Sequence, residues 1–116
     1  MENMEIISSK ISVAHLKELA KKMFGNLVKA VVDIEKGIMA IDGELHADEQ
    51  ALLLENGSKQ ENLWGINIYP EKSGDDFIEF DSVINIRPSQ NNRSRGVDDS
   101  EIRMKILEIT NKLIEK

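Results

Sequence analysis

Two apolar runs separated by only three residues restrict this chain to folds that contain an antiparallel sheet. Residues 27–34 and 38–42 are both strand-like, and the connection between them is Glu35-Lys36-Gly37. A three-residue connection that contains glycine suits a tight hairpin, because one position of such a turn needs a positive φ. Along the first run, one face carries Val28, Ala30, Val32 and Ile34, and the other carries Lys29, Val31 and Asp33. We therefore expect a hairpin with one clearly more apolar face.

Strict alternation further along the chain indicates a second pair of strands. Trp64, Ile66 and Ile68 alternate with Gly65, Asn67 and Tyr69. After a loop at residues 70–76, the apolar phase continues at Ile78, Phe80, Ser82, Ile84 and Ile86. We expect one long strand there, or a strand that is kinked near Asp81-Ser82. A symmetrical hairpin would pair Asn67 with Glu79, Ile66 with Phe80 and Trp64 with Ser82.

Helical spacing occurs in three segments. Ser12 is a good N-cap for a helix over residues 12–24, which Gly25-Asn26 ends. Residues 46–57 form a second, short helix with two acids in its first turn, where they suit the helix dipole. Asp99 or Ser100 can cap a third helix that runs to the C-terminus. Its apolar stripe consists of Ile102, Ile106, Ile109 and Leu113.

The alternation of helical and strand patterns predicts an α+β fold. With 116 residues and 41% hydrophobic content, the chain can bury one core, so we expect a single domain over residues 1–116. The expected architecture is a mainly antiparallel sheet of four to five strands with about three helices packed on one face. That face would carry Val32, Trp64, Ile66, Ile68, Phe80 and Ile84.

The opposite face of the sheet has two interpretations. The odd positions of the expected long strand are Phe77, Glu79, Asp81, Val83, Asn85 and Arg87. These residues form either the solvated face of a half-buried sheet, which is a normal arrangement, or a shallow cleft floored by Glu79 and Asp81. In the second case both carboxylates are candidate acid–base residues.

His46 and Glu49 are further acid–base candidates, since three residues apart on a helix they lie on one side and can share an ion or a proton. The alternative is that His46 or Ala47 begins the helix and that Asp48 and Glu49 satisfy its free amides. His15 does not support a metal site, because it lies beside Lys17 and Glu18 in the first helix and is expected to face solvent. We predict neither a metal nor a cofactor.

The segment from Arg87 to Gly96 carries only positive charges in an otherwise acidic chain. Guanidinium groups grip phosphate or carboxylate through paired hydrogen bonds, and hydroxyl and amide side chains add further donors. The candidate anion-binding residues are Arg87, Asn91, Asn92, Arg93, Ser94 and Arg95. Alternatively, these arginines pair with the carboxylates of Asp81, Asp98 or Glu101 and only fasten the loop to the sheet.

Composition excludes several classes of function. The absence of cysteine excludes disulfides and thiolate chemistry and agrees with a reducing compartment, so we expect a cytoplasmic protein. No apolar run approaches the roughly 20 residues that span a bilayer, and the acidic N-terminus is unlike a signal peptide. A net charge of -6 and few aromatic residues disfavour nucleic acid as a partner.

Several strings of the chain resemble a family of small uncharacterised bacterial and archaeal proteins, which is catalogued as a domain of unknown function. These strings are residues 43–49, 57–60, 63–67 and 77–82, together with the loop at 87–96. The resemblance covers nearly the whole chain. It implies a stand-alone prokaryotic cytosolic protein, but it implies no activity and no catalytic residue.

Two functional hypotheses follow. The first is a non-enzymatic binding or interaction protein, expected to be a homodimer, whose Arg87, Arg93 and Arg95 engage a small anionic molecule or a protein partner. The alternative is an enzyme on phosphorylated or nucleotide substrates, with the same arginines on phosphate and the acids or His46 as base or metal ligands. The enzyme requires a cleft that brings an arginine and an acid together.

Overall fold

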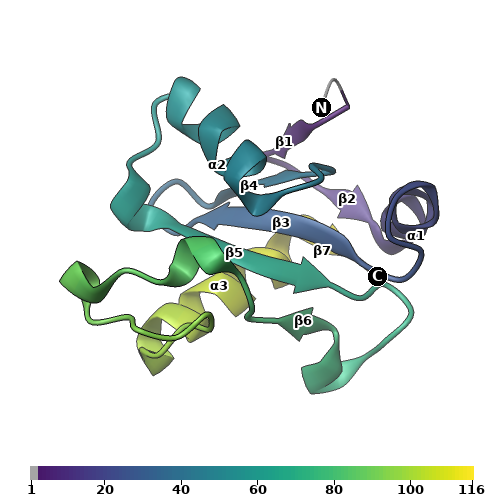
Figure 1. Ribbon diagram of the computed structural model, residues 1–116. Helices are drawn as coiled ribbons and strands as arrows, with labels where there is room; N and C mark the ends of the chain where they lie inside the picture. Colours follow the sequence, from purple (N-terminus) through teal and green to yellow (C-terminus); the bar gives the residue numbers. More distant parts are fainter. Residues whose placement is uncertain (1–2) are drawn as a thin grey trace.

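The predicted sheet is present and has five strands. A computed structural model describes residues 3–116, so Met1 and Glu2 lie outside the described part of the chain. The strands are β1 (Glu5–Ile7), β3 (Val28–Asp33), β4 (Ile38–Ile41), β5 (Leu63–Ile68) and β6 (Ile78–Glu79). They pair in the order β1-β4-β3-β5-β6, and each of these pairings is antiparallel (Figure 1).

The described residues also form three α-helices: α1 (Val13–Lys22), α2 (His46–Glu55) and α3 (Ser100–Leu113). Single 3-10 turns lie at Gln60–Asn62, Gly74–Asp76, Val83–Asn85 and Pro88–Gln90. A parallel pair of two-residue strands, β2 (Ile11–Ser12) and β7 (Ile114–Glu115), joins the start of α1 to the end of α3. The last helix therefore ends at Leu113, not at the C-terminus as predicted. None of the helices in residues 3–116 has the length and apolarity needed to cross a membrane.

Local signals in the sequence placed most of these elements correctly. The Ser12 hydroxyl accepts a hydrogen bond from the His15 amide at 3.1 Å and caps α1, as predicted. The β3–β4 hairpin has Gly37 at a φ of +70° in its turn, which is the conformation that called for glycine. Asp99 caps α3 by accepting from the Glu101 amide at 2.8 Å.

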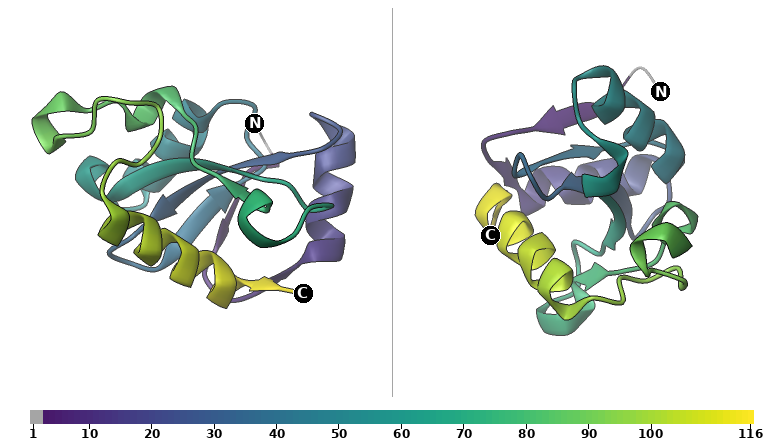
Figure 2. Two further views of the ribbon diagram at one scale, coloured as in Figure 1. Left: turned by 90° about the horizontal axis from the view of Figure 1, so that it is seen from below. Right: turned by 90° about the vertical axis from the view of Figure 1, so that its left-hand side faces the viewer.

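The sheet is covered on both faces, and this differs from the predicted arrangement. Helices α1 and α3 pack on the face of Trp64 and Ile66 and form the main core. Helix α2 packs on the opposite face (Figure 2). There Leu53 meets apolar residues from three strands. The reason lies in the strands, which are apolar on both faces at Val31, Ala40 and Leu63. One layer of helices would leave these side chains in water.

The predicted long strand over residues 78–86 is wrong. Strand β6 ends at Glu79, so the pairing of Asn67 with Glu79 is confirmed, but the pairs Ile66 with Phe80 and Trp64 with Ser82 are not formed. The side chain of Asn85 takes the place of a strand beside Gly65: its Oδ1 accepts from the Gly65 amide at 2.8 Å, and its Nδ2 donates to the Gly65 carbonyl at 3.0 Å. An amide side chain therefore satisfies the backbone that a longer strand would have paired.

The departure of this segment from the sheet changes which residues are buried. Phe77, Asn85 and Arg87 were expected on a solvated or cleft-forming face, but all three are buried. Ile84 packs on the α2 side of the sheet, not with Trp64 as predicted. Val83 and Ile86 remain exposed. The segment after Glu79 thus folds as an irregular cap over one end of β5.

Candidate functional site

A cavity of about 250 Å³ lies on the α2 side of the sheet, where the first turn of α2 faces the segment after β6. Its lining combines polar and apolar groups from five parts of the chain. The lining residues are Lys29, Leu45, His46, Ala47, Asn67, Asp81, Ser82, Val83, Ile84 and Arg95. Three of the sequence-predicted site residues, His46, Asp81 and Arg95, therefore meet in one place.

The floor of the cavity is a polar row that crosses three strands. Lys29 of β3 is in register with Asn67 of β5, which is in register with Glu79 of β6. Asn67 Nδ2 donates to Glu79 Oε1 at 2.9 Å and to the Asp81 carbonyl at 3.4 Å. Both partners are acceptors, which fixes the orientation of the amide. Glu79 Oε1 also accepts from the Tyr69 hydroxyl at 2.9 Å, so Glu79 lies beside the cavity and is held by neighbours.

His46 forms one wall. Its Nε2 lies 2.8 Å from the carbonyl oxygen of Ile66. A carbonyl only accepts, so Nε2 carries the hydrogen and Nδ1 keeps its lone pair in the neutral ring. Burial lowers the pKa of His46, and the bond to the Ile66 carbonyl opposes that shift. The imidazole is therefore a neutral hydrogen-bond acceptor near pH 7.

Gly65 allows His46 and Ser82 to come close to β5. A Cβ atom at Gly65 would lie 2.6 Å from the Cβ of Ser82 and 3.2 Å from Cδ2 of His46. Real Cβ atoms essentially never come as close as 2.6 Å, so any larger residue would push the Ser82 wall of the cavity outward. Gly65 is thus part of how the cavity is built.

Arg95 and Asp81 form an ion pair at the mouth of the cavity. Arg95 Nε donates to Asp81 Oδ1 at 2.6 Å, and both side chains are about half exposed. The hydrogen bond to Asp81 raises the pKa of Arg95, so the guanidinium is charged at any physiological pH. Within residues 3–116, Nε makes the one described hydrogen bond of this side chain, which leaves its two terminal nitrogens available to a ligand.

The other residues of the predicted anion loop do not line this cavity. The buried guanidinium of Arg87 donates to the carbonyl oxygens of Gln60 and Leu63 and lies 4.1 Å from the centroid of the Trp64 ring. Burial lowers the pKa of Arg87. Arg87 therefore fastens the loop to β5 and to the 3-10 turn before it.

Asn92 and Asp98 hold the loop in shape from within. Asn92 is buried and its Nδ2 donates to three backbone carbonyls of residues 85, 94 and 96. Asp98 accepts from the Ser94 hydroxyl at 2.6 Å and from the Arg93 amide at 3.0 Å, and these bonds lower the pKa of Asp98. The side chains of Asn91 and Arg93 are exposed on the outside of the loop.

Glu49 is buried behind the cavity and does not reach it. Its Oε2 accepts from the Gly43 amide at 2.9 Å. Burial raises the pKa of Glu49 well above 4.5. His46 and Glu49 thus bond to different backbone groups, and no group of three metal-ligating side chains occurs in the part of the chain that the structure describes.

A comparison with protein families matches residues 5–113 to the family described as Protein of unknown function (DUF5674). The chain belongs to this family. Neither the curated proteins nor the solved structures contain a match to this DUF5674 protein. Its family thus agrees with the resemblance seen in the sequence and leaves the function to be argued from the cavity.

Reasoning from the sequence missed several residues that shape the cavity of this DUF5674 protein. Lys29 carried a signal, because it is a single cation inside an apolar strand and therefore has to lie where its ammonium can reach solvent or an anion. The sequence signal for Asn67 was weaker: it is a polar residue between Ile66 and Ile68. Leu45 and Ser82 gave no signal, since their role depends on how the chain folds back.

Proposed function

We propose that this DUF5674 protein binds a small organic anion in the cavity between α2 and the segment after β6. The observation that supports the proposal is the meeting of two cations, Lys29 and Arg95, with one carboxylate, Asp81, in its lining. Asp81 aligns the guanidinium through Nε and leaves its terminal nitrogens free for a carboxylate or a phosphate group.

The volume of the cavity and the apolar residues at its mouth limit which ligands can fit. At about 250 Å³ it is smaller than sites that enclose drug-sized molecules, which start at roughly 300 Å³. Leu45 and Val83 are 55% and 63% exposed beside it, so apolar surface is available next to the charged groups. A ligand with one anionic group and a short apolar part fits both features.

A second candidate function is an enzyme that acts on a small phosphorylated substrate. The observation in its favour is that His46, with a lone pair on Nδ1, lines the same cavity as Arg95 and Asp81. Arg95 would bind the phosphate and His46 would accept a proton. Turnover of a phosphate monoester that is lost in His46→Gln would support the enzyme, whereas binding without turnover supports the first proposal.

We also propose that the protein acts in the cytoplasm of a prokaryotic cell as a homodimer. The lack of cysteine agrees with a reducing compartment. For the dimer, the support is the outer side of α3, where Met104 is 61% and Leu107 is 38% exposed. Sedimentation velocity at high protein concentration measures the oligomeric state directly. A monomer at that concentration would contradict the proposed dimer.

The proposed ligand class can be tested by a thermal-shift screen with short carboxylates and phosphate monoesters. A ligand at about 100 times its Kd adds about 2.7 kcal/mol of stability and raises Tm by several degrees. Arg95→Ala should abolish the shift. Arg93→Ala removes the same charge from the same loop but outside the cavity, so it should retain the shift. A shift lost equally in both variants would contradict the proposed site.

A further inference from the structure

We propose that the outer side of α3 is the contact between two copies of this chain, packed as an antiparallel pair of helices. The inference rests on the homodimer proposed above and names its interface. Helix α3 lies at the outside of the molecule (Figure 2). Its residues Ile106, Thr110 and Leu113 are buried against the rest of the chain. The opposite side of the helix is therefore the one that a partner can reach.

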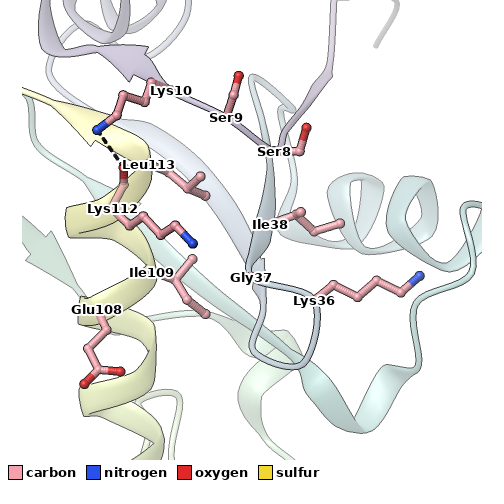
Figure 3. Close-up of a pocket in the computed structure, with 10 residues that line it drawn as sticks. All are labelled: Ser8, Ser9, Lys10, Lys36, Gly37, Ile38, Glu108, Ile109, Lys112 and Leu113. Atoms are coloured by element: carbon pink, nitrogen blue, oxygen red, sulfur yellow. Dashed lines mark hydrogen bonds between the residues drawn. The ribbon is translucent and has the colours of Figure 1, made fainter.

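Charges alternate along the outer side of α3. Four exposed residues share one flank of the helix at spacings of four, three and four residues: Glu101, Lys105, Glu108 and Lys112. The ion pairs described for residues 3–116 include none of them. Figure 3 shows Lys112 extended over the pocket beside α3, and the flexible stem of lysine lets its ammonium turn from there to a facing carboxylate. These charges are therefore available to a partner.

This order of charges complements itself when the two helices run in opposite directions. A symmetric parallel pair would place each residue beside the same residue of the second copy, so acid would meet acid. In an antiparallel pair, Glu101 can lie beside Lys112 of the second copy. Further along the pair, Lys105 then lies beside Glu108, because each step along one helix is a step back along the other. By two-fold symmetry each of these contacts occurs twice.

The same register places an apolar side chain beside an apolar cavity. Met104, Leu107 and Asn111 share one side of α3, next to the charged flank, and Met104 is 61% exposed. In the antiparallel pair, Met104 lies between Leu107 and Asn111 of the second copy, as measured along the helix axis. Leu107 and Asn111 line a cavity of about 440 Å³ whose other walls include Phe77 and Phe80.

A methionine suits this cavity. Its flexible side chain fills irregular apolar space, and its sulfur makes favourable contacts with aromatic rings. Met104 of each copy would therefore leave water and enter the cavity of the other copy. A contact between two identical surfaces requires a surface that complements itself. The outer side of α3 meets this requirement in the order of its charges and in the match between Met104 and the cavity beside Leu107, which favours a second copy over a foreign partner.

The test measures the dimer Kd by sedimentation equilibrium of the full chain. Glu101→Lys should raise Kd about tenfold, since its contacts with Lys112 become repulsions. Lys112→Glu should raise Kd to a similar extent. An equimolar mixture of the two variants should dimerise more tightly than either variant alone, because the facing charges of unlike chains are again opposite. Changes within each helix are the same before and after mixing, so they cannot produce this result.

Glu18→Lys is the matched control. It reverses an exposed acid four residues before a lysine, as Glu101→Lys does, but on α1, and it should leave Kd unchanged. Met104→Ser supplies an independent check, because it keeps every charge and should still raise Kd. Met23→Ser changes another exposed methionine, at the end of α1, and should not raise Kd. Circular dichroism should first show that all variants keep their helices.

The outcomes separate the interface from the dimer itself. A native dimer that Glu101→Lys weakens no more than Glu18→Lys, or a mixture no tighter than its components, would overturn the interface and leave the dimer standing. Equal Kd values for Met104→Ser and Met23→Ser would also contradict the interface. A native chain that stays monomeric at high concentration would overturn both.

Discussion

Glu49 is a carboxylic acid on α2, and its side chain has no solvent-exposed surface. Its Oε2 accepts one backbone hydrogen bond from Gly43, while Oε1 has no partner among the described residues. A Cβ at Gly43 would lie 2.7 Å from Cγ of Glu49, so this position has room only for glycine. One hydrogen bond does not compensate a buried negative charge, which explains why the pKa of this group is raised.

The raised pKa of Glu49 predicts a specific pH dependence of stability. As pH rises above about 4.5, the unfolded chain releases this proton while the folded protein retains it. The free energy of unfolding of the native protein should therefore fall, relative to Glu49→Gln, as pH rises from 4.5 until the folded-state pKa is passed. Urea denaturation at a series of pH values measures the difference.

Glu55→Gln provides the control, because it removes an exposed carboxylate from the same helix. Parallel pH profiles for the native protein and Glu49→Gln would show that Glu49 is ionised at no cost, which would contradict the burial argument.

At the scale of elements, the segment between β6 and α3 is the least regular part of the fold and the most important for the cavity. Its shape depends on side chains that bond to the backbone. Asn85 pairs with Gly65, Arg87 with the carbonyl of Leu63, and Asn92 with three carbonyls of its own loop. These bonds hold the loop in the shape in which Arg95 Nε donates to Asp81 Oδ1.

Asn92 should therefore be a stability determinant. Asn92→Ala removes the two hydrogens that Nδ2 shares among three carbonyls and the acceptor for the Asp98 amide. We expect a loss of about 3 kcal/mol in chemical denaturation. Asn91→Gly is the matched control with an expected change below about 0.5 kcal/mol, because Asn91 is exposed and has a φ of 61° that glycine adopts freely. Comparable losses in both variants would show that the loop is not held by Asn92.

Elements with strong local signals were predictable from the sequence, and this irregular segment was not. The caps at Ser12 and Asp99 and the three-residue turn with Gly37 placed two helices and a hairpin within a few residues. The alternation from Ile78 to Ile86 favoured a strand equally well. It failed because the Asn85 side chain competes for the edge of β5, and no local periodicity reports such a long-range bond.

At the scale of the whole molecule, α2 on the second face of the sheet creates the cavity. A sheet with all helices on one face would leave Lys29 and Asn67 on an open surface. Helix α2 lies over that face of the sheet (Figure 2). Its first turn and the segment after β6 line the cavity together with Lys29 and Asn67. Arg95 was predicted as an anion ligand and does line the cavity, and its pair with Asp81 is the one that the alternative interpretation of the loop predicted. The other lining residues at positions 29, 46 and 67 could not be brought together with it from spacing along the chain.

The central claim is that a small organic anion binds at this cavity, and an amide-detected NMR titration with butyrate and propyl phosphate tests it most directly. We expect chemical-shift changes that saturate and cluster at Gly65, Asn67, Ser82 and Arg95. The same titration of Arg95→Ala should show none of them. Changes confined to the exposed loop at residues 91–94, or the absence of saturating changes with both anions, would contradict the account.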